Sequence, residues 1–254
     1  MRRAPRSRPV AEPAAVSSER YERLDALRGV AIVWMVAFHF SFDLNHFHFI
    51  RQNFYADPVW TVQRTCIVSL FLFCAGVGQS VAWHLGQGWP RFWRRWVRVA
   101  VCAGLVTLGS WWMFPRSFIS FGVLHGLALM LLLMRLTAPW ASRWLLLLGA
   151  VALALPHVFR HPFFDTMATN WVGLVTHKPV TEDYAPLLPW VGLMWWAMVA
   201  GRWTLERRPD WLTGPLPRAG RPLALLGRWP LSIYMLHQPL LIGLVSVAAW
   251  LRAG

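Results

Sequence analysis

Residues 23–43 read RLDALRGVAIVWMVAFHFSFD, an apolar stretch of membrane-spanning length with ionisable groups near both ends. At about 100° and 1.5 Å per residue, the eleven-residue step from Arg28 to His39 places both side chains on one face of a helix, roughly 16 Å apart along its axis. Asp43 lies one further turn along, within reach of His39. Because ionisable groups are costly when they face lipid, this face is predicted to look into a helical bundle or an aqueous cavity.

The composition is that of a membrane protein. Hydrophobic residues make up 56% of the chain and charged residues 14%, far from the balance of soluble domains. Apolar stretches suited to crossing about 30 Å of hydrocarbon recur along the chain, of which the fifth is the shortest. They cover residues 26–44, 66–84, 97–114, 118–136, 144–156, 187–205 and 230–251. We therefore predict an all-α integral membrane protein, a bundle of about seven transmembrane helices.

The net charge of +14 comes almost entirely from arginine, and its placement predicts the topology. With the N-terminus in the cytoplasm, most arginines fall in cytoplasmic segments, as the positive-inside rule requires. Seven spans then place the C-terminus outside. This distribution assigns the basic charge to topology and to contact with anionic lipids, so we expect the lipid bilayer as a partner and no nucleic acid.

The chain divides into two segments. Residues 1–20 are rich in Arg, Pro, Ala and Ser without apolar periodicity, and they are predicted to form a disordered basic cytoplasmic tail. Residues 21–254 are predicted to form one polytopic membrane domain. The three cysteines, Cys66, Cys74 and Cys102, fall inside apolar stretches, so we expect neither a disulfide framework nor a metal site.

Histidines inside or at the ends of the predicted spans are the candidates for catalysis. Asp43 is placed to accept a hydrogen bond from one ring nitrogen of His39 and leave the other as a base. The alternative is a buried ion pair that only stabilises helix packing. His125 and His237 lie inside the fourth and seventh predicted spans, where an interhelical hydrogen bond is the structural alternative. Together these four residues form the predicted catalytic set.

The ends of the spans supply candidate binding residues. Arg28 stands at the inner mouth of the first span, where a guanidinium suits a phosphate-bearing ligand, and Arg94 and Arg95 are predicted to add contacts. Snorkelling to the lipid surface explains such arginines equally well. Gln238, beside His237, is predicted to line a cavity, and Asp183, just outside the sixth span, is placed to hold a substrate hydroxyl or amine. A helix entry with an N-terminal carboxylate is the alternative for Asp183.

Several motifs in a fixed order carry a family resemblance. They comprise residues 23–29 (RLDALRG), 38–44 (FHFSFDL), 71–76 (FLFCAG), 121–125 (FGVLH), 183–190 (DYAPLLPW) and 226–228 (LGR), followed by 237–239 (HQP). In this order they resemble the heparan-alpha-glucosaminide N-acetyltransferase catalytic-domain family, in its short bacterial form. Arg28 and His39, with ten residues between them, are similar to an arginine–histidine pattern of the wider membrane acyltransferase superfamily.

The resemblance implies an enzyme of the bacterial cytoplasmic membrane that uses acetyl-CoA as a co-substrate, with no permanently bound cofactor. The donor would approach from the cytoplasm, near Arg28, and its acetyl group would pass to an amine or hydroxyl of an outward-facing sugar or glycoconjugate. His39 would deprotonate the acceptor or take the acetyl group transiently. In the lysosomal branch the essential histidine lies in the first outer loop, a role for which His46 or His48 is the alternative here. By the same resemblance, Tyr184 joins the candidate substrate-binding residues.

Two other classes of function stay open. A transporter or flippase for a small solute or a lipid-linked saccharide would use the same histidines and Asp43 as a proton relay. The chain shows no internal repeat of the kind common in transporters, which counts against this alternative. A membrane scaffold without a small-molecule site is disfavoured by the buried ionisable groups.

Overall fold

The computed structural model describes residues 21–253, so the predicted tail, residues 1–20, lies outside the described part of the chain. The described residues form helices and no strands. The long helices are α1 (Glu22–His46), α2 (Pro58–His84), α3 (Trp89–Met113), α4 (Val123–Thr137), α5 (Ser142–Val158), α6 (Leu187–Arg207) and α9 (Pro230–Ala253). Short elements are η1 (Pro162–Asp165), η2 (Asn170–Val172), α7 (Asp210–Thr213), η3 (Arg218–Gly220) and α8 (Arg221–Leu226). The predicted all-α class is confirmed.

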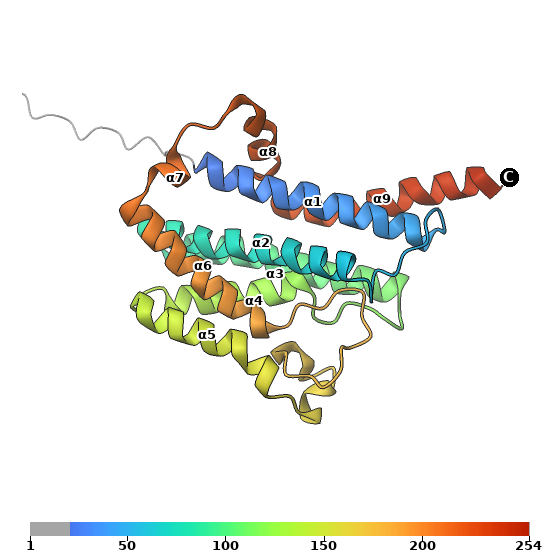
Figure 1. Ribbon diagram of the computed structural model, residues 1–254, viewed down its shortest axis with the longest axis horizontal. Helices are drawn as coiled ribbons and strands as arrows, with labels where there is room; N and C mark the ends of the chain where they lie inside the picture. The colour runs from blue at the N-terminus through green and yellow to red at the C-terminus, as the bar shows by residue number, and fades with distance from the viewer. Residues whose placement is uncertain (1–20, 254) are drawn as a thin grey trace, which may run out of the picture.

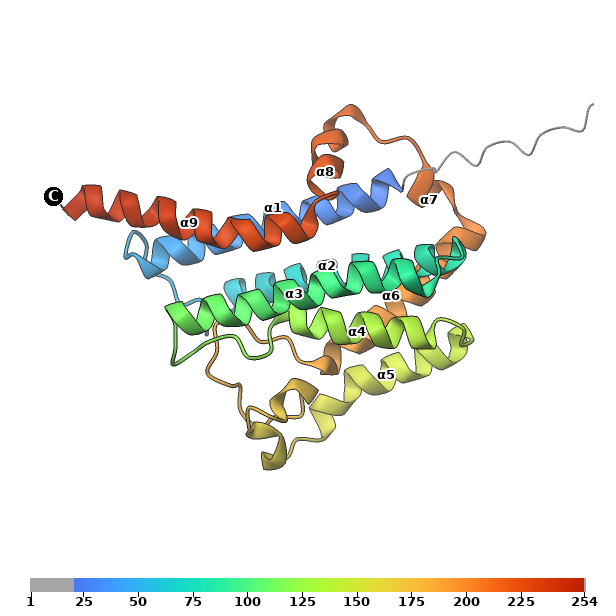
Figure 2. The ribbon, with the colours of Figure 1, turned by 180° about the vertical axis from the view of Figure 1, so that it is seen from behind.

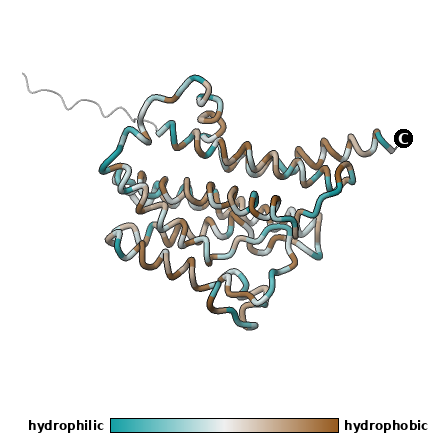
Figure 3. The backbone as a smooth tube through the Cα atoms, viewed as in Figure 1, coloured by the Kyte–Doolittle hydropathy of each residue, from teal (hydrophilic) through white to brown (hydrophobic). Residues whose placement is uncertain are grey.

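The long helices lie roughly side by side and form layers (Figures 1 and 2). The first and last helices, α1 and α9, pack together along one side of the bundle. The next layer contains α2 and α3, where α2 packs against α6 and α3 against α4. The remaining long helix, α5, covers the far side of α6. The long helices are rich in hydrophobic residues, whereas the connections are more hydrophilic (Figure 3).

Four helices of the described chain, α1, α2, α3 and α9, are long and apolar enough to cross a membrane. Two others, α4 and α5, are apolar but shorter. The membrane class is thereby confirmed, while seven crossings and the direction of insertion stay predictions. Many aliphatic and tryptophan side chains on the outer surfaces of α3 and α9 are exposed, as expected for helices that face lipid.

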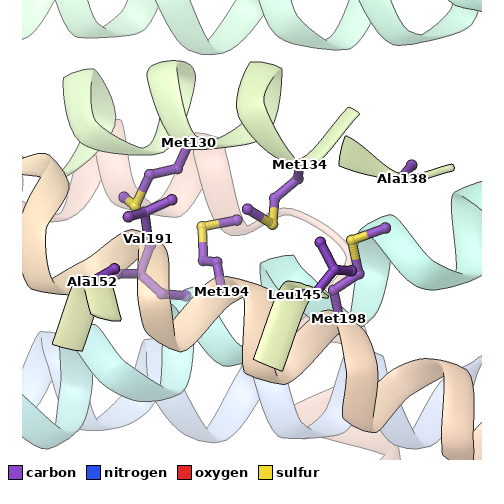
Figure 4. Close-up of a cluster of buried hydrophobic side chains, with 9 residues drawn as sticks. Met130, Met134, Ala138, Leu145, Ala152, Val191, Met194 and Met198 are labelled. Carbon is purple, nitrogen blue, oxygen red and sulfur yellow. The ribbon is translucent and has the colours of Figure 1, made fainter. Parts of the chain in front are cut away.

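A methionine-rich core joins α4, α5 and α6 (Figure 4). Met130 and Met134 of α4 meet Met194 and Met198 of α6, and all four side chains are fully buried. Leu145 of α5 closes the cluster from the other side. Unbranched methionine side chains fill irregular gaps between helices, and the buried residues of this cluster are all apolar.

Arginines fasten the connections at the end of the bundle that is predicted to be cytoplasmic. Arg23 donates to the carbonyl oxygen of Asp210, at the start of α7. Arg135 donates to the carbonyl oxygen of Gln87 between α2 and α3, and its guanidinium lies over two tryptophan rings. Arg202 donates to two carbonyl oxygens between α4 and α5. Part of the basic charge therefore stabilises loops directly.

The segment before α9 presses against the start of α1. A side chain at Gly29 would collide with the carbonyl oxygen of Leu223 in α8, and one at Gly227 would collide with that of Asp25. Only glycine lets two backbones approach so closely. These two contacts explain why glycines follow Arg28 in the first motif and Leu226 in the last, and they fix α8 beside the inner half of α1.

Candidate functional site

Two histidines from the two ends of the chain meet between α1 and α9. The ring centroids of His39 and His237 lie 5.0 Å apart, with an interplanar angle of 61°. Nδ1 of His237 lies 2.8 Å from the carbonyl oxygen of Tyr234, one turn earlier in α9. Because a carbonyl oxygen only accepts, Nδ1 carries the proton of the neutral ring and Nε2 keeps its lone pair.

Asp43 pairs with α9 and not with its own helix. The side-chain amide of Gln238 donates to Oδ1 of Asp43 at 2.9 Å. The other oxygen, Oδ2, is buried and has no hydrogen-bond partner within residues 21–253. The predicted hydrogen bond from His39 to Asp43 is therefore wrong. The amide of Gln238 occupies the position facing the carboxylate because α9 packs against this face of α1.

Three buried acceptors in this cluster have no donor in the part of the chain that the structure describes. They are Oδ2 of Asp43, Oε1 of Gln238 and Nε2 of His237, and the side chains of Asp43 and His237 are almost fully enclosed. Buried polar atoms in proteins nearly always have a partner, and an unpaired one costs about 1–3 kcal/mol. Such a concentration of unpaired acceptors is typical of a site that binds a group with hydrogen-bond donors.

A second carboxylate approaches the same part of α9 from the segment before α6. Oδ2 of Asp183 accepts the backbone N–H of Val123, the first residue of α4, at 2.7 Å. The Asp183 carboxylate is also close enough to the Tyr234 side chain of α9 to interact with it electrostatically. Burial raises the pKa of the Asp183 carboxyl, whereas the charges of nearby Lys178 and Arg64 act in the opposite direction. Asp183 therefore acts as a carboxylate at a helix N-terminus, as the structural alternative predicted. The helix is α4, however, and not the sixth predicted span.

His125 stands apart from this cluster in its contacts. Its Nδ1 accepts the backbone N–H of Gly122 at 3.3 Å, and its Nε2 lies 3.1 Å from Oγ1 of Thr107 in α3. The Thr107 hydroxyl in turn donates to the carbonyl oxygen of Ile119. Both ring nitrogens are thereby used within the fold, which matches the structural alternative for His125.

The other residues that were predicted to bind the substrate lie towards the outer loops. His46 and His48 are exposed at the end of α1, and His48 adopts a positive φ of 62°. The Tyr184 hydroxyl donates to the carbonyl oxygen of Asn170 at 2.7 Å, which ties two parts of the long outer connection together. Burial and the charge of Asp165 raise the pKa of Tyr184 to about 12. The described geometry brings none of the three into hydrogen-bond contact with His39.

The inner half of α1 carries Arg28, which was predicted to bind a phosphate-bearing ligand. Nη1 of Arg28 forms an ion pair with Oδ1 of Asp25 at 2.8 Å. Its guanidinium lies against Gly78 of α2, where an added Cβ would come within 2.9 Å of Nη2. Arg95 of α3 is close enough for the charge of Arg28 to act on it, and it donates to the Gln87 side chain at 3.3 Å. The structure thus brings Arg28 and Arg95 to one region.

Arg94 is placed differently from Arg95. Its Nε donates to the carbonyl oxygen of Pro90 in its own helix at 3.4 Å, and its side chain is exposed. A hollow of about 30 Å³ opens on the other side of Arg95 between α2, α3 and α4, lined also by Gln79, Gln87 and Trp96. Both arginines are exposed, and of the two Arg95 is the one that lines this hollow.

Comparison of the sequence with known protein families identifies the family of this chain. The model of the family described as "Heparan-alpha-glucosaminide N-acetyltransferase, catalytic" matches residues 20–239. The chain belongs to this family. The matched region runs from the start of α1 to Pro239, so it contains both the Arg28 and the His39 ends of the site. Searches of curated proteins and of solved structures gave no match.

Membership of the heparan-alpha-glucosaminide N-acetyltransferase family confirms the resemblance drawn from the motifs and indicates a transmembrane acetyltransferase. Its site contains one residue that the sequence did not single out, Tyr234, whose ring centroid lies 5.8 Å from that of His237 and whose side chain interacts with Asp183. Tyr234 precedes His237 by three residues, so the two side chains share a helix face. That spacing was the available signal, although nothing in it identified Asp183 as the partner.

Proposed function

We propose that the protein transfers an acetyl group from cytoplasmic acetyl-CoA to an amine or hydroxyl of an outward-facing sugar or glycoconjugate. In this proposal it lies in a bacterial cytoplasmic membrane with its N-terminus inside and its C-terminus outside. The observation that carries it is the arrangement along α1. In one half of α1, Arg28 pairs with Asp25 and is close enough to Arg95 of α3 for the two charges to interact. In the other half, the ring of His39 contacts that of His237. A long, phosphate-bearing thioester fits a site with cations at one end and imidazoles at the other.

At the donor end, guanidinium groups bind the phosphate groups of the nucleotide. Arg28 is oriented by its ion pair with Asp25, so less freedom is lost when it binds a ligand. The lack of a side chain at Gly78 lets this guanidinium lie against α2. The eleven-residue step of about 16 Å from Arg28 to His39 is the distance that the thioester arm has to span.

At the acceptor end, the imidazole pair takes up the proton that the acceptor loses. The acceptor nitrogen or oxygen attacks the thioester carbonyl carbon, the C–S bond breaks, and the coenzyme leaves as a thiolate that then takes up a proton. His39 serves as the base, with His237 in contact with its ring. The free lone pair on Nε2 of His237 and the unpaired Oδ2 of Asp43 are suited to accept hydrogen bonds from the acceptor. A transient acetyl-histidine on His39 is the alternative sequence of steps.

Calorimetry of acetyl-CoA binding to the detergent-purified protein tests the donor end without knowledge of the acceptor. We expect saturable binding that Arg28→Ala weakens at least tenfold and that His39→Ala leaves within about twofold. Arg160→Ala is the matched control, because Arg160 is exposed beyond the end of α5 and donates only to the carbonyl oxygen of Pro156 among its described contacts. Absence of binding by folded protein would contradict the proposal and favour a transporter.

Transfer of radiolabelled acetyl groups from acetyl-CoA to a panel of amino sugars and polyols then tests the acceptor end. Wild-type protein should label at least one acceptor class, and the modified atom, nitrogen or oxygen, is read by mass spectrometry. His39→Ala should lower the rate by about 10²–10⁴-fold, the usual contribution of a general base. A variant that still transfers acetyl groups at the wild-type rate would rule out His39 as the base.

A further inference from the structure

A pocket of about 240 Å³ opens at the end of the bundle where α1 begins and α8 packs against it (Figure 1). Its lining comes from the first turn of α1, from α8 and from the connections on either side of α8, namely Glu22, Leu216, Arg221, Ala224, Leu225 and Arg228. Arg28 follows Glu22 by six positions, so at about 100° per residue the two side chains point about 120° apart around α1. The pocket therefore lies apart from the candidate donor site.

Two arginines give this pocket hydrogen-bond donors that the described fold does not use. The Arg221 side chain is exposed and has no hydrogen bond or ion pair with another of residues 21–253. Nη2 of Arg228 lies 3.6 Å from Oε1 of Glu22, which is too far for a hydrogen bond. One carboxylate thus faces two guanidinium groups, and the pocket carries a surplus of positive charge. Planar guanidinium groups of this kind bind phosphate oxygens through two N–H donors at once.

The pocket adjoins the surface of the membrane. Helix α9 begins at Pro230, two residues after Arg228, and both α9 and α1 are long and apolar enough to cross a membrane. Leu225 in the pocket is 57% exposed, and Trp229, the residue after Arg228, is 63% exposed. Tryptophan at the end of a span lies at the level of the lipid headgroups. Cations beside exposed apolar side chains suit a ligand that carries both a phosphate and acyl chains.

We propose that this pocket binds the phosphate headgroup of an anionic glycerophospholipid. Arg221 and Arg228 hold the phosphate oxygens, and Leu225 and Trp229 contact the acyl chains. Basic pockets beside the cytoplasmic ends of membrane helices bind such headgroups, and the proposed orientation of the chain places this pocket on that side. The lipid site goes beyond the proposed acetyl transfer and does not depend on it, because its residues take no part in the proposed reaction.

Glu22 limits the affinity of this pocket for a phosphate. Its carboxylate forms an ion pair with Arg228 and competes with the phosphate for the same guanidinium. Two like charges in one pocket also repel each other. Neutralising Glu22 should therefore strengthen lipid binding, whereas neutralising either arginine should weaken it.

Native mass spectrometry of the full-length protein in detergent micelles counts the bound lipids and measures their affinity. The probes are phosphatidylglycerol and phosphatidylcholine with the same acyl chains, which differ in the net charge of the headgroup. We expect one phosphatidylglycerol to bind at least fivefold more tightly than phosphatidylcholine. Equal affinities for the two lipids would overturn the proposal.

Matched substitutions locate the bound lipid. Arg221→Gln and Arg228→Gln should each lower the affinity for phosphatidylglycerol about fivefold, the contribution of one basic residue at an anionic membrane surface, and Glu22→Gln should raise it by a similar factor. Arg207→Gln and Glu206→Gln are the controls, because both residues are exposed at the end of α6 and neither lines the pocket. Each control should change the affinity less than twofold. Equal losses in Arg207→Gln and Arg221→Gln would show that only the general charge of this end attracts lipid, and would overturn the pocket.

Competition separates a lipid from a soluble phosphate. Inorganic phosphate and coenzyme A should leave the bound phosphatidylglycerol in place, since neither carries acyl chains for Leu225 and Trp229. Displacement of the lipid by either compound would assign the pocket to a soluble phosphate and overturn the proposed occupant. If the protein transfers no acetyl group, the proposed function fails, whereas the lipid measurements still decide what this pocket binds.

Discussion

The side-chain amide of Gln238 donates to the carboxylate of Asp43 at 2.9 Å, although 195 residues separate the two in the chain. This bond joins the outer half of α1 to α9 and places Gln238 beside the histidine pair. It also leaves one carboxylate oxygen and the amide oxygen as buried acceptors without donors among the described residues. The first and last long helices therefore share a polar contact that still has acceptor capacity on both side chains.

Removing the Gln238 side chain should lower the free energy of unfolding more than neutralising Asp43 does. Gln238→Ala leaves the buried Asp43 carboxylate without a donor, which is worth about 1–3 kcal/mol. Asp43→Asn keeps an oxygen that accepts the Gln238 amide, so it should unfold close to the wild-type temperature. Thermal unfolding in detergent measures both. A Gln238→Ala protein as stable as the wild type would show that this bond does not hold α9 on α1.

His39 and His237 should behave as one unit in catalysis. Each alanine variant is expected to lower the acetyl-transfer rate by about 10²–10⁴-fold. The double variant should lose little more than the worse single variant, because residues that act together give non-additive losses. His157→Ala, at the exposed outer end of α5, is the control and should keep its rate. Strictly multiplicative losses in the double variant would contradict a shared role.

Several features followed from local sequence alone. The apolar stretches located the long helices, and the spacing within 23–43 predicted that Arg28 and His39 lie on one face of a helix. In the structure Arg28 lies against α2 and His39 contacts α9. Helical periodicity is a local property, so one helix face can be predicted without knowing the fold. The order of the motifs identified the family for the same reason, since each motif lies within one short segment.

The partners across helices did not follow from the sequence. Asp43 was assigned to His39, one turn away, whereas its donor is Gln238 from the last long helix. His125 was grouped with the catalytic histidines, yet its two nitrogens contact Gly122 and Thr107. Which side chain fills the space opposite a given group depends on how helices pack, and no local pattern encodes that choice.

The outer segment should loosen in acid through Asp165. Both oxygens of its carboxylate accept hydrogen bonds from Thr176, and the side-chain bond, at 2.6 Å, is the main reason that the pKa of Asp165 lies below its usual range. Because the folded pKa is depressed, these bonds stabilise the segment above the ordinary carboxyl pKa and are lost as the pH falls through the folded value.

An NMR titration of the Asp165 side-chain carbon tests this depression directly. Thr176→Val removes the side-chain donor and should raise the pKa of Asp165 towards that of a free aspartate. Thr166→Val is the control, because Thr166 bonds to Thr169 and not to Asp165. An Asp165 pKa that is the same in the wild type and in Thr176→Val would contradict the assignment of the shift to this hydrogen bond.

The approach of α8 to α1 makes Gly29 the most sensitive glycine of the first motif. An alanine there would drive its Cβ into the carbonyl oxygen of Leu223, and backbone atoms cannot move aside as a flexible side chain does. Gly29→Ala should therefore destabilise the protein by about 1–3 kcal/mol and weaken acetyl-CoA binding, since α8 would shift away from the turn that holds Arg28. Gly104→Ala, in α3, is the control because its added methyl meets nothing within 4 Å, so it should be neutral. Equal unfolding temperatures for the two variants would show that α8 is free to move from α1 at no cost.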